Sequence, residues 1–144
     1  MPPSRQHIDV NLDVQHRART TSSDVLWRGI ADGRGRGILR GAITVAPGAD
    51  GADAQLQTKN LLLSPHAEID AQPVLEIYAD EVKASHGATV GQLDERVLFY
   101  LRSRGIPIAQ ARDLLIAGFA REALARDDGL LDAWLAHHAK GAAA

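Results

Sequence analysis

The chain contains no cysteine and few aromatic residues, and both scarcities limit its chemistry. Its 144 residues include two Trp, two Tyr and two Phe, so an apolar core has to consist mainly of Leu, Ile, Val and Ala. Without cysteine, the chain alone offers no disulfide, no thiolate nucleophile, no cysteine-type zinc site and no thiolate ligand for an iron–sulfur cluster.

Charge balance and the lack of long apolar runs exclude further classes of protein. Lys and Arg number 16 and Asp and Glu number 18, and the resulting net charge of −2 argues against a dedicated nucleic-acid binder. The longest run of Leu, Ile and Val covers only residues 61–63, whereas a membrane span needs about 20 apolar residues. The first residues have no apolar stretch of the secretory type, and we expect a cytoplasmic protein.

Residues 7–91 have the pattern of short β-strands. Apolar and polar residues alternate from Ile8 to Val14, which predicts a strand with one buried and one solvent-facing side. Shorter apolar pieces follow, separated by turn residues such as Asp32-Gly33, Asp50-Gly51 and Ser64-Pro65. A sandwich, a barrel and a β-solenoid each produce such a pattern, so all three stay open at this point.

Residues 92–139 have helical periodicity. Asp94 is placed to cap a first helix, and Gly105 to end it in a left-handed conformation. Pro107 suits the first turn of a second helix, and Asp127 can cap a third. The change of period predicts a β domain over residues 1–91 and a helical segment over residues 92–144, an α+β arrangement.

Two clusters suggest chemistry but have simpler interpretations. The glycine-rich residues 29–37 lack the Gly-Lys-Ser/Thr ending of a phosphate-binding loop, and we interpret them as a tight turn between strands. The basic residues Arg28, Arg34, Arg36 and Arg40 are interpreted as a solvated face, because few aromatic residues lie among them.

The six histidines have no metal-site spacing. A metal hydrolase built from His66, Asp70, Asp80 and His86 is an alternative that only tertiary structure could assemble. His86 has the most unusual surroundings, at the end of the β region and just before the helices, where functional residues often lie. The alternative for His86 is a structural histidine, hydrogen-bonded at the junction.

Several segments together resemble a known family. They read NLLLSPHAEI and PVLEIYADEVK within residues 60–83, SHGATVGQLD over residues 85–94 and LFYLRSRGI over residues 98–106. These segments resemble the C-terminal region of the SufB/SufD family of iron–sulfur cluster assembly proteins, and the SHGATVG form is more similar to SufD members than to SufB members. The resemblance covers roughly residues 24–124.

The resemblance implies a fold and a role. The implied fold is mostly β: a truncated right-handed parallel β-helix over residues 1–91, followed by a small C-terminal helical segment. The implied role is that of a non-catalytic scaffold subunit, not an enzyme, in the complex of SufB, SufC and SufD that assembles iron–sulfur clusters. The implied partners are a SufC-type ABC ATPase and a SufB-type subunit, or a second copy in a homodimer, with no nucleic acid and no membrane.

The resemblance also implies site residues. His86 matches the family histidine implicated in cluster formation, so it is the candidate cluster or metal ligand, whereas no catalytic residue is expected. The cluster would be transient in the full complex, with no cofactor bound by this chain alone. The helices would dock the ATPase through the following residues: Leu98, Tyr100, Leu101, Arg102, Arg104, Gly105 and Ile106.

Two departures from the family pattern matter. Ala84 stands where many SufD members have cysteine, so this position offers no thiolate. The chain is also much shorter than family members, and an open first coil would expose strand edges that another chain or a second copy has to cover. The alternative function is therefore a truncated β-solenoid interaction module without assembly activity.

Overall fold

The computed structural model describes residues 5–124. The chain divides into two compact units, the first ending at Gln92 and the second beginning at Leu93. The first unit contains the strands β1 (His7–His16), β2 (Ser22–Ala31), β3 (Arg36–Val45), β4 (Asp53–Leu62), β5 (Glu68–Ile77) and β6 (Lys83–Gln92). The second contains the helices α1 (Glu95–Ser103) and α2 (Ile108–Leu124).

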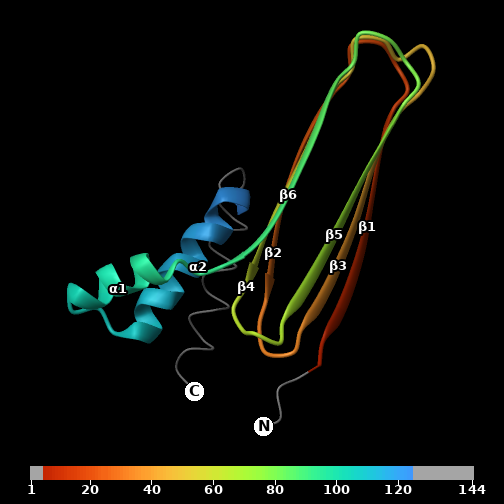
Figure 1. Cartoon of the computed structure of the whole chain (residues 1–144). Coiled ribbons are helices and arrows are strands. Elements are labelled where there is room, and N and C mark those ends of the chain that lie inside the picture. The colour runs from red at the N-terminus through yellow and green to blue at the C-terminus, as the bar shows by residue number, and fades with distance from the viewer. Residues whose placement is uncertain (1–4, 125–144) are drawn as a thin grey trace. The chain divides into compact units, whose positions relative to one another are not determined.

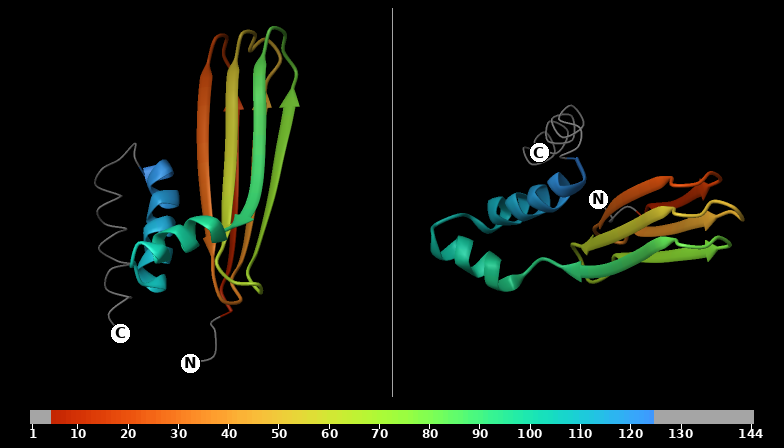
Figure 2. Two further views of the ribbon diagram at one scale, coloured as in Figure 1. Left: turned by 60° about the vertical axis from the view of Figure 1, so that its left-hand side comes forward. Right: turned by 90° about the horizontal axis from the view of Figure 1, so that it is seen from above.

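The strands form two parallel sheets of three strands each, in the orders β1-β3-β5 and β2-β4-β6 (Figure 1). Each strand pairs in register with the strand two places later in the chain; His7 lies opposite Arg36, which lies opposite Glu68. Consecutive strands alternate between the sheets, which lie face to face (Figure 2). The return of the chain through the opposite sheet supplies the crossover that parallel pairing requires.

The core lies between the two sheets. Ile43, Ala54 and Leu56 are at most 2% exposed and form one buried cluster, against which Leu12, Val14, Val25, Leu75 and Ala84 pack. The alternation predicted from Ile8 to Val14 is confirmed in β1, whose apolar residues face this core. The structure thus confirms a mostly β region with parallel strands followed by helices, and the strands of residues 5–124 form no closed barrel.

The turns after β1, β3 and β5 stack on one another. The Thr20 amide donates to the Asp50 carbonyl at 2.9 Å, and the Gly51 amide donates to the Asp80 carbonyl at 3.2 Å. Thr20, Gly51 and Glu81 all have left-handed backbones, with φ of 55°, 75° and 55°. The three turns therefore share one left-handed position, although only the turn after β3 has glycine there.

The glycine-rich segment forms the turn that we predicted. Gly29 lies in β2 and Gly37 in β3, and between them the Gly35 amide donates to the Asp32 carbonyl at 2.9 Å. Arg40 is exposed and contacts Asp9 at 2.8 Å, as the predicted solvated face requires. Arg28 does not belong to that face, because it lies in β2 of the other sheet and is partly buried.

The helix ends also follow the predicted capping. The Asp94 side chain accepts a hydrogen bond from the Arg96 amide, and Gly105 has a φ of +85°. Helix α2 begins at Ile108, directly after Pro107, whose carbonyl accepts from the Ala111 amide at 2.9 Å. The predicted third helix after Asp127 lies outside the described residues. Between residues 5 and 124, no helix is both long and apolar enough to cross a membrane.

Candidate functional site

His86 lies in β6, which is an edge strand of its sheet. The register places His86 opposite Leu56, which lies opposite Val25. Paired residues of parallel strands project to the same side, and Leu56 is 2% exposed in the core, so the His86 ring is on the inner side of the sheet. Because no strand of the described part covers the other edge of β6, His86 is nevertheless exposed.

Polar side chains of β4 fix the strand that carries His86. Thr58 Oγ1 donates to the Gly87 carbonyl at 3.4 Å, and Asn60 Nδ2 donates to the Thr89 carbonyl at 3.2 Å. Thr58 and Asn60 are 1% and 3% exposed. Buried side-chain bonds to the edge backbone add to the ladder and hold β6 in one register. Sequence reasoning missed both residues, although polar residues at inward positions of a strand were a usable signal.

Ala84 lies two residues before His86 on the same inner side of β6 and packs against the buried cluster around Ile43. A cysteine at this position would therefore share one face with the histidine, and the alanine leaves His86 without a thiolate neighbour on its strand. Ser85 projects to the opposite side, where its hydroxyl hydrogen-bonds to the side chain of Gln55.

The alternative metal site is not assembled in the described part of the chain. Residues 5–124 contain no group of three or more His, Asp or Glu side chains that could hold a metal ion, so His66, Asp70 and Asp80 do not join His86. A single imidazole cannot complete the coordination of an iron–sulfur cluster. His86 alone therefore does not form a metal or cluster site within residues 5–124.

The predicted docking residues of α1 divide into a buried and an exposed group. Leu98 is 3% exposed, and Leu101 and Ile106 are partly buried, while α1 and α2 pack against each other. Leu98 therefore supports the helix pair and does not offer a contact surface. Tyr100 is 54% exposed, and Arg102 and Arg104 are exposed as well.

The exposed end of α1 has a defined geometry. The Arg104 guanidinium lies 5.1 Å from the centre of the Tyr100 ring, a cation–π distance. The Gly105 amide donates to the Arg102 carbonyl at 2.9 Å and the Ile106 amide to the Leu101 carbonyl at 3.2 Å. This pair of bonds is the Schellman motif that a left-handed glycine permits. The i, i+4 spacing of Tyr100 and Arg104 could have revealed their contact from the sequence.

Among the described residues, the pKa values that are clearly shifted belong to Asp94 and Arg96, at the start of α1. The Asp94 carboxylate accepts hydrogen bonds from the Arg96 guanidinium and from the Arg96 amide, each at 2.9 Å. The side-chain bond first and the amide bond second hold the pKa of Asp94 below its ordinary value of 3.8. The same ion pair raises the pKa of Arg96. These shifts belong to helix capping and not to a reactive centre.

Comparisons with known proteins agree with this arrangement. Residues 1–119 match the model of the family described as SUF system FeS cluster assembly, SufBD core domain. The chain is 42% identical over 132 residues to the iron-sulfur cluster assembly protein SufD of Escherichia coli strain K12, which covers 90% of this chain and 31% of the relative. A SufBD family protein of Synechocystis is 40% identical over 121 residues, covering 84% of this chain and 26% of the relative.

A SufBD family protein of Mycobacterium tuberculosis H37Rv is likewise 40% identical over an alignment of 129 residues, which covers 84% of this chain and 32% of the relative. The chain thus spans about a quarter to a third of the length of these curated relatives. The family model matches more than half of the chain, including all six strands and α1. The chain belongs to the SufB/SufD family of iron–sulfur cluster assembly proteins of the SUF system.

Proposed function

We propose that this chain acts as a SufD-like, non-catalytic scaffold in iron–sulfur cluster assembly. In this proposal it pairs with a SufB-type subunit and docks a SufC-type ABC ATPase. The observation that carries the proposal is the position of His86, an exposed imidazole on the inner side of the edge strand β6. The 42% identity to a SufD supports the assignment.

The two parallel sheets are, in this proposal, coils of a right-handed parallel β-helix. Strands that alternate between two sheets and pair in register with the strand two places later suit such coils. Each coil buries its inward side chains against the next coil, as in other solenoid proteins. The last coil, β5 and β6, then ends in a free edge on which a SufB-type subunit can continue the pairing.

His86 serves as a ligand of the transient cluster and not as a catalytic residue. A neutral imidazole binds iron through a ring nitrogen, as it does in Rieske centres. The missing thiolates come from the SufB-type subunit, because this chain has no cysteine. The exposed Tyr100, Arg102 and Arg104 of the helical unit form the docking surface for the ATPase, while Leu98 keeps the helices together.

The test compares two histidine variants in the complete complex. His86→Ala should lower the amount of cluster formed on reconstitution while leaving complex formation unchanged, because the ring is exposed and carries no core packing. His66→Ala removes another exposed histidine of the same unit and should change neither. Equal cluster yields for both variants, measured by absorbance and iron content, would rule out the ligand role of His86.

The alternative is a β-solenoid interaction module that has lost the assembly role. Residues 5–124 contain no group of three or more His, Asp or Glu side chains that could hold a metal ion, which favours this second candidate. A folded chain that associates with neither subunit would support it.

A further inference from the structure

Two aspartate–glycine pairs lie in turns of the first unit and have the same preceding residue. Asp32-Gly33 lies in the turn after β2 and Asp50-Gly51 in the turn after β3, and an alanine precedes each aspartate. An aspartate before glycine is chemically sensitive, because glycine has no side chain to hinder attack of its amide nitrogen on the aspartate side chain. Since the two tripeptides are identical, a difference in their reactivity has to come from the fold.

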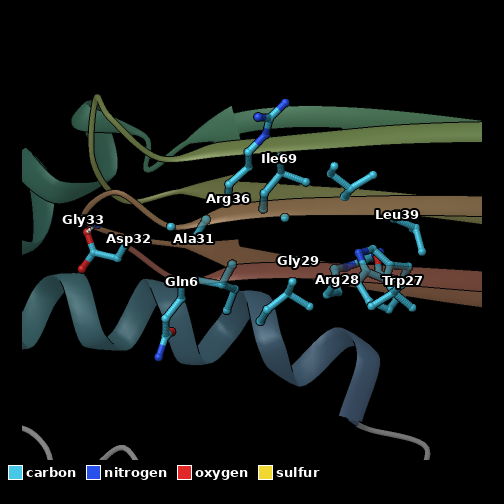
Figure 3. A pocket seen from close by; sticks show the side chains of 16 residues that line it. Gln6, Trp27, Arg28, Gly29, Ala31, Asp32, Gly33, Arg36, Leu39 and Ile69 are labelled. Carbon is cyan, nitrogen blue, oxygen red and sulfur yellow. Dashed lines mark hydrogen bonds between the residues drawn. The ribbon is translucent and has the colours of Figure 1, made fainter. Parts of the chain in front are cut away.

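The reacting groups of the first pair lie against each other. The Gly33 amide donates to Asp32 Oδ1 at 2.7 Å, so the nitrogen is already beside the carboxyl group that it would attack (Figure 3). Gly33 has a left-handed backbone with a φ of 60°, and Asp32 is exposed to water. Within residues 5–124, neither the Asp32 carboxylate nor the Gly33 amide has a partner in a neighbouring turn. The fold therefore leaves both groups available to each other.

Neighbouring turns restrain the second pair. The Gly51 amide donates to the Asp80 carbonyl at 3.2 Å, and Asp50 Oδ1 accepts from the Asp80 amide at 3.0 Å. Asp50 Oδ2 also lies 3.5 Å from Arg19 Nη1, and the Asp50 side chain is only 28% exposed. The nitrogen and the carboxyl group of this pair thus bond to other turns and not to each other, and a reaction between them would break these contacts.

We propose that Asp32 is a modification site, at which the chain converts spontaneously to isoaspartate while Asp50 is spared. The Gly33 nitrogen loses its proton and forms a bond to Asp32 Cγ, and one carboxyl oxygen leaves as water. Water then opens the resulting cyclic imide: addition at Cγ restores aspartate, whereas addition at the backbone carbonyl carbon of Asp32 leaves isoaspartate with a free carboxylate. The second step consumes the water that the first releases, and neither step is a redox reaction.

Conversion would change the turn that joins β2 to β3. The main chain would run through Cγ of Asp32, which adds a carbon atom to the backbone. At present the Gly35 amide donates to the Asp32 carbonyl at 2.9 Å, and Ser64 Oγ donates to the Gly33 carbonyl at 2.6 Å. The Asp32 carbonyl would become the free carboxylate, and the Gly33 carbonyl would move with the lengthened chain. The contact between the turns after β2 and β4 would therefore be weakened. This inference does not rest on the proposed function.

The test ages the full chain in neutral buffer at physiological temperature and follows two tryptic peptides. Cleavage after arginine and lysine releases Asp32 in residues 29–34 and Asp50 in residues 41–59. Isoaspartate is measured in each peptide by methyl transfer from S-adenosylmethionine with an isoaspartyl methyltransferase, and its position is assigned by electron-transfer fragmentation. We expect isoaspartate to form about tenfold faster or more at Asp32 than at Asp50, because the fold brings the reacting groups together at Asp32.

Two controls separate the fold from the sequence. In concentrated urea the two rates should become equal, since the two tripeptides are identical. Asp32→Glu keeps the charge but places the carboxyl carbon one bond farther from the backbone, so methyl transfer to residues 29–34 should be lost while that to residues 41–59 is unchanged. Circular dichroism checks that the variant folds. Equal rates in the folded chain, no isoaspartate at Asp32, or a difference that persists in urea would overturn the proposal.

Discussion

Replacement of Gly29 by alanine tests the packing of the inner face most severely. An added Cβ would lie 2.4 Å from Asn60 Oδ1 and 3.2 Å from both Trp27 Nε1 and Ile69 Cδ1. Asn60 is 3% exposed, and its Nδ2 donates to the Thr89 carbonyl at 3.2 Å, so the amide cannot move away without loss of that bond. The substitution therefore disturbs both the core and the support of β6.

The expected destabilisation follows from these contacts. Overpacking costs about 1–3 kcal/mol, and loss of a buried hydrogen bond about 1–3 kcal/mol. Alanine returns roughly 0.4–1 kcal/mol by reducing the entropy of the unfolded chain. We expect Gly29→Ala to lower the free energy of unfolding by about 3 kcal/mol.

Urea denaturation followed by circular dichroism and Trp27 fluorescence measures this value. Gly87→Ala is the matched control on β6, where an added Cβ meets nothing within 4 Å, and it should be neutral or slightly stabilising. In a double-mutant cycle, Asn60→Ala should recover part of the cost of Gly29→Ala. Equal stabilities of the Gly29 and Gly87 variants would refute the reasoning.

Further predictions concern the turns and the first helix. Glu81→Gly should raise the free energy of unfolding by about 0.5–1 kcal/mol, because Glu81 has a left-handed backbone with a φ of 55°. Gly51→Ala should lower the free energy of unfolding by about 1–2 kcal/mol for the same reason. An unchanged thermal stability of either variant would contradict backbone strain at these two positions. The lowered pKa of Asp94 stabilises α1 at neutral pH, and this contribution is lost as the pH falls below 3.8 toward the folded-state pKa. Asp94→Asn should remove that acid-dependent loss of helical signal, and an unchanged acid titration would exclude Asp94 as its source.

Local elements could be predicted from the sequence because their causes are local. The alternation from Ile8 to Val14 fixes which side of β1 is buried, and Asp94 and Gly105 satisfy helix ends by rules that involve a few neighbouring residues. The boundary between the strands and the helices followed from the change of hydrophobic period.

Pairing between strands could not be predicted in the same way. Period 2 identifies the buried face of β1 but not its partner, which is β3 and not the adjacent β2. The left-handed turn at Glu81 has no glycine to signal it, because stacking on the turn at Gly51 determines its backbone. The bonds from Thr58 and Asn60 to β6 depend on the same register, so the support of His86 became visible only in the structure.

The most direct test of the proposed scaffold role is size-exclusion chromatography with light scattering. The full chain is run alone and mixed with a SufC-type ATPase and a SufB-type subunit. We expect a stable complex that contains all three proteins. Separate elution of a chain that circular dichroism shows to be folded would contradict the scaffold role.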